Sequence, residues 1–361
     1  MLITILAAFI SLIGLIVLHE FGHFILAKRF GVKVEEFGIF LPPRLIGKKI
    51  GETIYSLNLL PLGAFVKVRG EEGGIESADS FPGRPIWQRA LIILGGVVSF
   101  WIISVILLSI VMGMGVPTAI SDEENENLID PKVQIAAIAP GSPAEETEIK
   151  PGDTIKQLII NNQQLTINKV KEVQEFTNLH KGEEVTLTIE RGKEIFEVSL
   201  VPRVSPPEGE GPMGVALVRT AIKSYPWYLA PVKGIEACLK ITGAYTTGLV
   251  QILGNLIQGK GLPLEAPVMG PVGIVSLMTQ FVKLGITYYL QFLAIISIGL
   301  AILNILPIPA LDGGKLLFLG IEAARKRPIS QKIEQQITTF FFALLIALMI
   351  WVTIKDIARL F

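Results

Sequence analysis

The chain has 361 residues, and half of them are hydrophobic. The mean hydropathy of +0.56 is high for a soluble protein and indicates membrane segments. The 32 basic and 32 acidic residues balance, so no strongly basic face indicates a nucleic-acid partner. The one cysteine, Cys238, excludes an intrachain disulfide and a cysteine zinc cluster.

Four apolar stretches approach the roughly 20 residues that cross a bilayer, which predicts four transmembrane helices. These stretches cover residues 2–30, 86–116, 288–306 and 337–354. Lysine and arginine cluster between the first and second stretches and again after the third. By the positive-inside rule, we expect both basic connections in the cytoplasm and both termini on the outer side of the membrane.

The first segment, residues 1–30, carries the sequence His19-Glu20-Phe21-Gly22-His23, which fits the pattern H-E-x-x-H. On a helix, residues i and i+4 share one face, so both imidazoles can point at one ion. Two neutral imidazoles at this spacing suit Zn²⁺, and Glu20 is placed to act as general base for a water at the metal. Such residues are costly inside a membrane, which favours a functional site over chance.

Within the segment 31–85, residues 31–70 alternate in polarity and contain several glycines. We expect short antiparallel strands here, with turns at residues 48–52 and 61–63. Strands with unpaired edges are not stable in lipid. This region is therefore predicted to pack on protein or to line a wet cavity, as a cytoplasmic-side β-strand element or re-entrant loop between the first helix and the second helix at 86–116.

For residues 117–220 the sequence predicts a soluble extracytoplasmic α+β domain with linkers. Period-two strands alternate with a short helical patch near 168–179, and "TLTIERGKEIFEVSL" predicts a hairpin turning at Arg191-Gly192. The stretch "APGSPAEETEIKPGDTI" resembles the PDZ domains of bacterial membrane-associated proteases. Two roles are open for such a domain. It could bind the C-terminal peptide of a partner, or it could exclude substrates with large outer domains; the second is favoured, because no pattern here proves a carboxylate-binding loop.

Residues 221–285 combine apolar residues with recurring charges, and Trp227 and Tyr228 suit a membrane interface. We expect interfacial amphipathic helices and a linker here, with a further spanning helix as the alternative.

In the segment 286–325, the stretch "NILPIPALDGG", residues 304–314, directly follows the predicted third helix. A tetrahedral catalytic zinc site needs a third protein ligand, and His180 lies in the soluble domain. Pro307 and Pro309 break helical bonding, and the two glycines after Asp312 let the backbone approach closely. Asp312 is therefore the expected third ligand. Asp312 reaches the membrane depth of the two histidines only if residues 221–285 do not cross the membrane. This requirement favours interfacial helices over a spanning helix in that region. The fourth helix and a tail follow in 326–361.

These features together resemble the site-2 protease family, and its bacterial regulator-of-sigma-E branch most closely. The resemblance rests on the HEFGH helix, "LLPLGAFVKVRGE", the PDZ-like insertion and "NILPIPALDGG". It implies that His19, His23 and Asp312 bind zinc, that Glu20 is catalytic and that Asn304 holds the substrate backbone. The second helix reads "GGVVSF" where many relatives have G-P-x-x-N-F, and its paired glycines favour close helix packing.

The function implied is that of an intramembrane zinc metalloprotease in a bacterial inner membrane. It would cut single-pass membrane substrates within their transmembrane segments, as in the regulated proteolysis of anti-sigma factors or signal-peptide remnants. A substrate helix must unwind locally before it is cut, and an edge strand near the site could pair with its backbone. The candidate residues of that strand are Phe65, Val66, Lys67 and Val68. The alternative is a non-proteolytic membrane metal carrier or a PDZ-based adaptor. A carrier would need several metal-binding groups along a path, and an adaptor would not need Glu20.

Overall fold

The computed structural model describes residues 2–71, 77–125, 128–161, 163–192, 194–207, 209–259 and 270–360. The chain forms two compact units, one made of Met1–Val111 with Trp227–Phe361 and the other of Met112–Pro226. The second unit is slightly longer at both ends than the domain predicted at 117–220. Residues 260–269 of the predicted 221–285 region lie outside the described residues.

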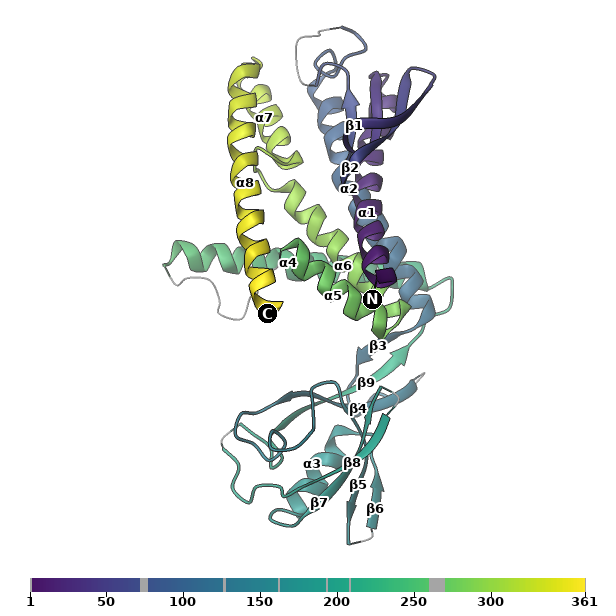
Figure 1. Ribbon diagram of the computed structural model, residues 1–361, viewed down its shortest axis with the longest axis vertical. Helices are drawn as coiled ribbons and strands as arrows, with labels where there is room; N and C mark the ends of the chain where they lie inside the picture. The colour runs from purple at the N-terminus through teal and green to yellow at the C-terminus, as the bar shows by residue number, and fades with distance from the viewer. Residues whose placement is uncertain are drawn as a thin grey trace. The chain divides into compact units, whose positions relative to one another are not determined.

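Four helices of the first unit, among the described residues, are long and apolar enough to cross a membrane. They are α1 (Leu2–Arg29), α2 (Ile86–Met114), α6 (Ile286–Ile305) and α8 (Gln331–Leu360), and they are visible in Figure 1. The shortest, α6, has 20 residues, which at about 1.5 Å per residue is about the thickness of a bilayer core. The four predicted apolar stretches therefore all form helices of spanning length.

The helix α4 (Ala230–Ile257) runs crosswise to α1 and α8 in Figure 1. It is not one of the four helices with spanning composition in the described part of the chain. Glu236 near its start accepts from Lys233 at 2.8 Å and from Lys240 at 2.7 Å, so this face is charged. The shorter α5 (Pro271–Leu284) follows. Both properties of α4 favour the interfacial prediction over the spanning one.

The contact between α2 and α6 depends on small and hydroxyl side chains. Ser104 donates to the carbonyl oxygen of Ala294 at 3.1 Å, and Ser297 donates to that of Phe100 at 2.8 Å. Both serines are fully buried. Small residues let two apolar helices approach closely, and hydroxyl groups bond across the contact. This pair of helices is therefore fixed in register as well as in contact.

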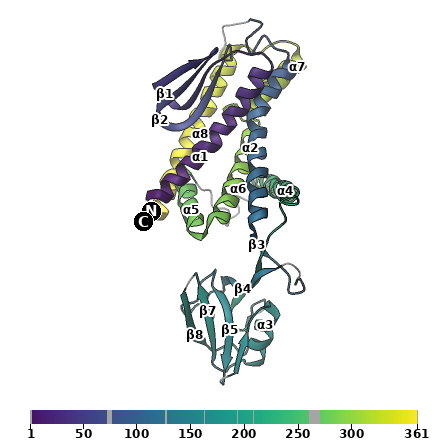
Figure 2. The ribbon, with the colours of Figure 1, turned by 90° about the vertical axis from the view of Figure 1, so that its right-hand side faces the viewer.

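The strands β1 (Val34–Ile50) and β2 (Thr53–Val68) form one bent two-stranded sheet beside α1 (Figure 2). Because both strands bend, Phe37 pairs with Val66 on one side and with Tyr55 on the other. The turn predicted at 48–52 joins the two strands. The turn predicted at 61–63 is instead a bend within β2, where Gly63 adopts a left-handed φ of 77°. Residues 64–68 pair with residues 34–39, and among the described residues they lie at an edge of the sheet.

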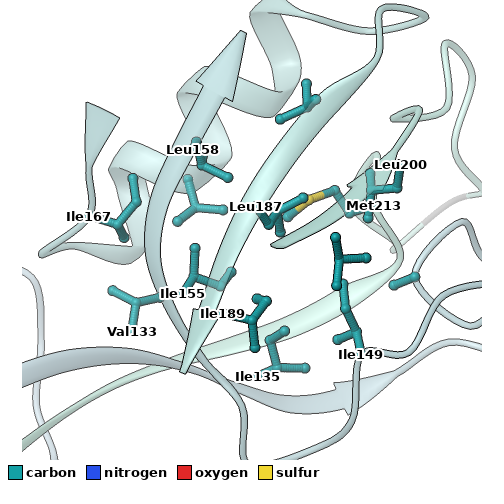
Figure 3. Close-up of a cluster of buried hydrophobic side chains, with 14 of the residues drawn as sticks. Val133, Ile135, Ile149, Ile155, Leu158, Ile167, Leu187, Ile189, Leu200 and Met213 are labelled. Atoms are coloured by element: carbon teal, nitrogen blue, oxygen red, sulfur yellow. The ribbon is translucent and has the colours of Figure 1, made fainter. Parts of the chain in front are cut away.

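The described residues of the second unit form an antiparallel sheet and one helix, α3 (Val170–Leu179). The sheet order is β3-β9-β4-β5-β7-β8, with β6 paired to β5. The strands are β3 (Val116–Ala119), β4 (Ile129–Ile138), β5 (Thr154–Ile160), β6 (Gln163–Thr166), β7 (Val185–Arg191), β8 (Glu194–Leu200) and β9 (Val215–Lys223). The core is built from inward-facing aliphatic side chains, and Leu158, Leu187 and Ile189 are fully buried (Figure 3). The predicted hairpin at Arg191-Gly192 is formed by β7 and β8.

The aspartate of "KPGDTI", Asp153, is buried in an ion pair with Arg191. Asp153 is 1% exposed and accepts from Arg191 Nε at 2.7 Å, from Arg191 Nη2 at 2.8 Å and from the backbone N–H of Lys150 at 2.8 Å. Burial alone would raise the pKa of Asp153, but these hydrogen bonds outweigh it and hold the pKa below its usual value. The pair thus joins the turn before β5 to the end of β7.

Candidate active site

One helix and the start of another bring three metal-binding side chains together. His19 and His23 project from α1, and Asp312 is the first residue of α7 (Asp312–Arg325). The two Nε2 atoms of the histidines are 3.3 Å apart. Asp312 Oδ2 is 3.4 Å from His19 Nε2 and 3.3 Å from His23 Nε2. The three predicted ligand atoms therefore form a nearly equilateral triangle.

This triangle has the size that a tetrahedral zinc site requires. Zinc lies about 2.0–2.2 Å from nitrogen and oxygen ligands, and two ligands at the corners of such a tetrahedron are separated by about 3.3–3.5 Å. All three distances fall at the lower end of this range. Asp312 Oδ2 is also buried without a hydrogen-bond partner among the described residues, as expected for an oxygen that faces a metal. The donor set fits Zn²⁺, with one coordination position left for water.

Neighbouring groups fix the orientation of both imidazoles. His23 Nδ1 lies 2.9 Å from the carbonyl oxygen of Ile92 on α2. Donation of its N–H to that oxygen leaves Nε2 as the free acceptor, which is the usual support for a metal-binding histidine. The ring of His19 stacks on Phe100, also on α2, at 4.6 Å between centroids. The helix α2 therefore supports both rings although it supplies no ligand.

Paired glycines bring α2 this close to α1. A Cβ atom on Gly22 would lie 2.2 Å from the carbonyl oxygen of Gly95, so the two backbones are nearly in contact. A Cβ atom on Gly96 would lie 2.2 Å from His23 Nε2 and 2.8 Å from His19 Cε1. The space where the two imidazoles converge therefore exists only because residue 96 has no side chain. The packing expected from "GGVVSF" is confirmed, and Gly96 additionally shapes the site.

The glycines after Asp312 have a similar explanation. The chain between α6 and α7 turns back on itself, and a Cβ atom on Gly313 would lie 2.1 Å from the carbonyl oxygen of Leu306. On Gly314 it would lie 2.3 Å from the carbonyl oxygen of Ile308. No side chain fits at either position. The two glycines therefore allow the compact turn that brings Asp312 to the histidines. The segment 286–325 contains the predicted third helix, α6, and a further helix, α7, after the proline break.

Glu20 lines a small cavity of about 70 Å³ next to the three ligands. His23 and Asp312 line the same cavity, so Glu20 faces the space beside the metal position. One water needs about 10–15 Å³ of such space, so the cavity has room for a few waters. Glu20 is thus placed where a general base for an attacking water would be.

Of the residues predicted to bind substrate, two from the strand line the cavity at Glu20 and the others, including the asparagine, do not. Val66 and Val68 line the cavity with Glu20, whereas Phe65 and Lys67 do not. Lys67 lies 3.8 Å from Glu35, and the Phe65 ring covers Gly38. This is the alternation expected of a strand with one face toward the site. Asn304 is not a lining residue of this cavity, and its amide donates to Leu300 one turn back on α6 at 2.9 Å.

Two charged residues that the sequence reasoning missed also line the cavity. Lys315, on α7, donates to Glu71 Oε1 at 2.6 Å, and both side chains face the space beside Glu20. Lys315 follows Asp312 by three residues, a spacing that places both on one helix face and was visible in the sequence. Glu71 follows β2 closely, but its approach to α7 depends on the fold.

Comparison with known proteins agrees with this geometry. The profile of peptidase family M50 matches residues 7–348. The chain belongs to peptidase family M50. It is 33% identical to a predicted zinc metalloprotease of Clostridium perfringens, with 98% of each chain covered. It is 27% identical to the regulator of sigma-W protease RasP of Bacillus subtilis, with 100% of each chain covered, and 29% identical to the zinc metalloprotease RasP of Geobacillus kaustophilus, with 98% of each covered.

The predicted family and enzyme class are therefore confirmed. The chain is an intramembrane zinc metalloprotease of the site-2 protease type, and its cofactor is zinc. Among solved structures, it is similar to the PDZ domains of SdrC-like proteins from two Listeria species. For Listeria monocytogenes the identity is 17% and the TM-score 0.21, covering 24% of this chain and 86% of that one. For Listeria innocua the values are 18% and 0.21, covering 24% and 92%.

Proposed function

We propose that His19, His23 and Asp312 bind the zinc ion of this metalloprotease and that Glu20 is its catalytic acid and base. The observation that carries this assignment is the triangle of two Nε2 atoms and one carboxylate oxygen with sides of 3.3–3.4 Å. Zn²⁺ at this position supplies Lewis acidity, which makes a water more nucleophilic and the scissile carbonyl more electrophilic.

The chain's own residues perform the proton transfers in this mechanism. Glu20 accepts a proton from the attacking water as the water adds to the carbonyl carbon of the scissile bond. Glu20 then returns the proton to the leaving amine when the carbon–nitrogen bond breaks. A carboxyl group bordering a small, largely closed cavity can act in both steps, because it stays within reach of the same few waters and of the substrate.

We further propose that the substrate is a single-pass membrane protein cut within its transmembrane segment. A transmembrane helix hides its carbonyl groups in internal hydrogen bonds, so the residues around the cut must unwind. Residues 64–68 form an edge of the sheet among the described residues, and this edge offers backbone groups to the unwound segment by strand addition. Val66 and Val68 face the cavity beside Glu20, which supports a role for this strand. Asn304 stays a proposed contact to the substrate backbone.

The name of the Bacillus relative assigns that protein to the control of a sigma factor. Membrane-anchored anti-sigma factors are therefore one proposed substrate class here, beside signal-peptide remnants. The proposed location is a bacterial inner membrane, with α1 and α6 running inward and both termini on the outer side. The basic residues between α6 and α8, which include Arg325, Lys326 and Arg327, support this orientation.

For the second unit we propose a PDZ-like domain that excludes substrates with large outer domains, with binding of a C-terminal peptide as the second role. If the domain acts as a filter, a chain lacking it cuts a substrate whose outer domain is intact, and the parent does not. A parent that cuts both equally well would contradict the filter.

The decisive experiment replaces Glu20 with Gln and measures both zinc content and cleavage of a membrane substrate. We expect the purified Glu20→Gln chain to retain one zinc ion, because the three ligands are unchanged. We expect cleavage to fall by at least about 100-fold, the lower end of what a positioned acid–base group contributes.

Glu175→Gln provides the matched control, because this carboxylate is 68% exposed on α3 in the second unit. It should cleave like the parent. Continued cleavage by the Glu20→Gln chain would contradict the mechanism. Zinc that survives removal of Asp312 as well as it survives Glu20→Gln would contradict the ligand assignment.

A further inference from the structure

A second, larger cavity lies next to the one at Glu20. Its volume is about 480 Å³, and it is lined by residues of α2, α7 and the start of α8. The two cavities share three lining residues: Glu71, Ile93 and Lys315. The larger space therefore meets the catalytic cavity at one small group of side chains.

The larger cavity is suited to hold water. Arg89 on α2 forms a two-pronged ion pair with Glu322 on α7, with Nη1–Oε2 and Nη2–Oε1 distances of 3.1 and 2.5 Å, and Glu334 adds a further carboxylate. Charged groups in an otherwise apolar helix assembly need water or each other. Pro328 and Ile329 also line it, and they lie in the connection between α7 and α8 that the sequence places in the cytoplasm.

The boundary between the two cavities is polar because of one ion pair. Lys315 Nζ lies 2.6 Å from Glu71 Oε1, whereas the third shared residue, Ile93, is apolar and 3% exposed. The Lys315 side chain is 45% exposed although the residue lies among packed helices, since it borders both cavities. The pair also joins α7, which carries Asp312, to the end of β2, which lines the site.

We propose that the Glu71–Lys315 ion pair is the polar passage through which water reaches Glu20, and that Lys315 is a positioning residue for the reaction. The inference rests on the proposed role of Glu20. Each turnover consumes one water, and a narrow apolar constriction tends to lose its water. The ammonium and carboxylate keep the constriction hydrated and hold the end of β2 at a fixed distance from α7.

The test uses a single cysteine in membranes of the full chain. Cys238 is the chain's one cysteine, so Cys238→Ala provides the background. We expect Lys315→Cys in this background to keep its zinc and to lower kcat by at least about tenfold, with little change in KM. A water-soluble aminoethyl methanethiosulfonate should modify the new thiol and restore most of the lost rate, because it returns a primary ammonium to position 315. The methyl reagent should modify the thiol without restoring the rate.

Lys156→Cys in the same background is the matched control. Lys156 Nζ lies 2.6 Å from Glu190 with side-chain exposures of 40% and 21%, against 45% and 23% for the proposed pair. It should cleave like its parent with either reagent. Full activity of unmodified Lys315→Cys, a thiol that the water-soluble reagents do not reach, or equal rescue by the methyl reagent would overturn the proposal. Modification of the thiol is measured by mass spectrometry and does not require catalysis, so it can be repeated in the Glu20→Gln chain. It therefore tests the water passage separately from the role assigned to Glu20.

Discussion

At the scale of single residues, the active site depends as much on a missing side chain as on those present. Gly96 lies where His19 and His23 converge, and any Cβ atom there would overlap the ring of His23. The clash involves two imidazoles held by Ile92 and Phe100, so they cannot simply move aside. Protein interiors tolerate such overlaps poorly, because packed neighbours must shift together.

We therefore expect Gly96→Ala to remove zinc from the protein while leaving the chain in the membrane. Zinc affinity should fall by at least about 100-fold, the upper range for losing a group that supports a metal ligand. Metal analysis of the purified chain measures this directly. Gly14→Ala on the same helix as the histidines is the control, because a Cβ atom at Gly14 would meet nothing within 4 Å. Equal zinc content in both variants would show that the site adapts to a methyl group.

The site residues show which information the sequence contains. His19, Glu20 and His23 were predictable because a helix places residues four apart on one face. Asp312 followed from the number of ligands that zinc needs and from the break at Pro307 and Pro309. Gly96 as part of the site, and the pairing of Glu71 with Lys315, were not predictable. Both depend on how α2 and β2 are placed against elements that are distant in the sequence. The local sequence pattern does not determine that placement.

At the scale of elements, β2 presents one face to the catalytic cavity, and its residues 64–68 lie at an edge of the sheet that the described residues form. If a substrate segment pairs with residues 64–68, its side chains lie about 4.5–5.5 Å from those of β2 on the same face. We expect Val66→Cys, in the Cys238→Ala background, to form a disulfide with a cysteine placed near the cleavage site of a substrate trapped by Glu20→Gln. Gel mobility under non-reducing conditions measures the product.

The control is Lys48→Cys, which lies in the part of β1 paired with Tyr55 rather than in the edge segment at 64–68. It should give no cross-linked product with the same substrate. Equal cross-linking from both positions would mean that the substrate does not add to the edge at Val66.

Element boundaries were less predictable than element types. The strand region was expected to turn at 61–63, yet β2 continues through this bend because Gly63 accommodates the change of direction without ending the strand. The separate helix α5 was not distinguished from α4 within the predicted 221–285 region. An apolar run with few polar or helix-breaking residues does not show where one helix ends, because the end depends on packing against other helices.

At the scale of the whole molecule, the number of membrane crossings decides whether the ligands can meet. The four spanning-length helices satisfy this requirement if α4 stays at the surface. In a Cys238→Ala background we expect Lys171→Cys on α3 to react with a membrane-impermeant maleimide in intact spheroplasts. Arg327→Cys, between α7 and α8, should react only after permeabilisation. Reaction of both cysteines from the outside would contradict the proposed orientation.

The class of the molecule was predictable, because hydropathy and charge bias report on the membrane directly. The second unit was also visible as a change to period-two patterning. The contacts that hold the helices together, such as Ser104 with Ala294 and Ser297 with Phe100, were not. They are single hydroxyl groups in long apolar runs, and nothing in the run itself indicates which neighbour they will meet.

One feature of the second unit bears on how such enzymes vary. Its two ends are bound side by side, since β3 pairs with β9 and the N–H of Tyr225 donates to the carbonyl oxygen of Met112 at 2.9 Å. Two neighbouring backbone ends can be bridged by a turn of a few residues. The second unit is therefore interchangeable in principle: another folded insert with adjacent ends could be grafted there while the catalytic unit is inherited unchanged.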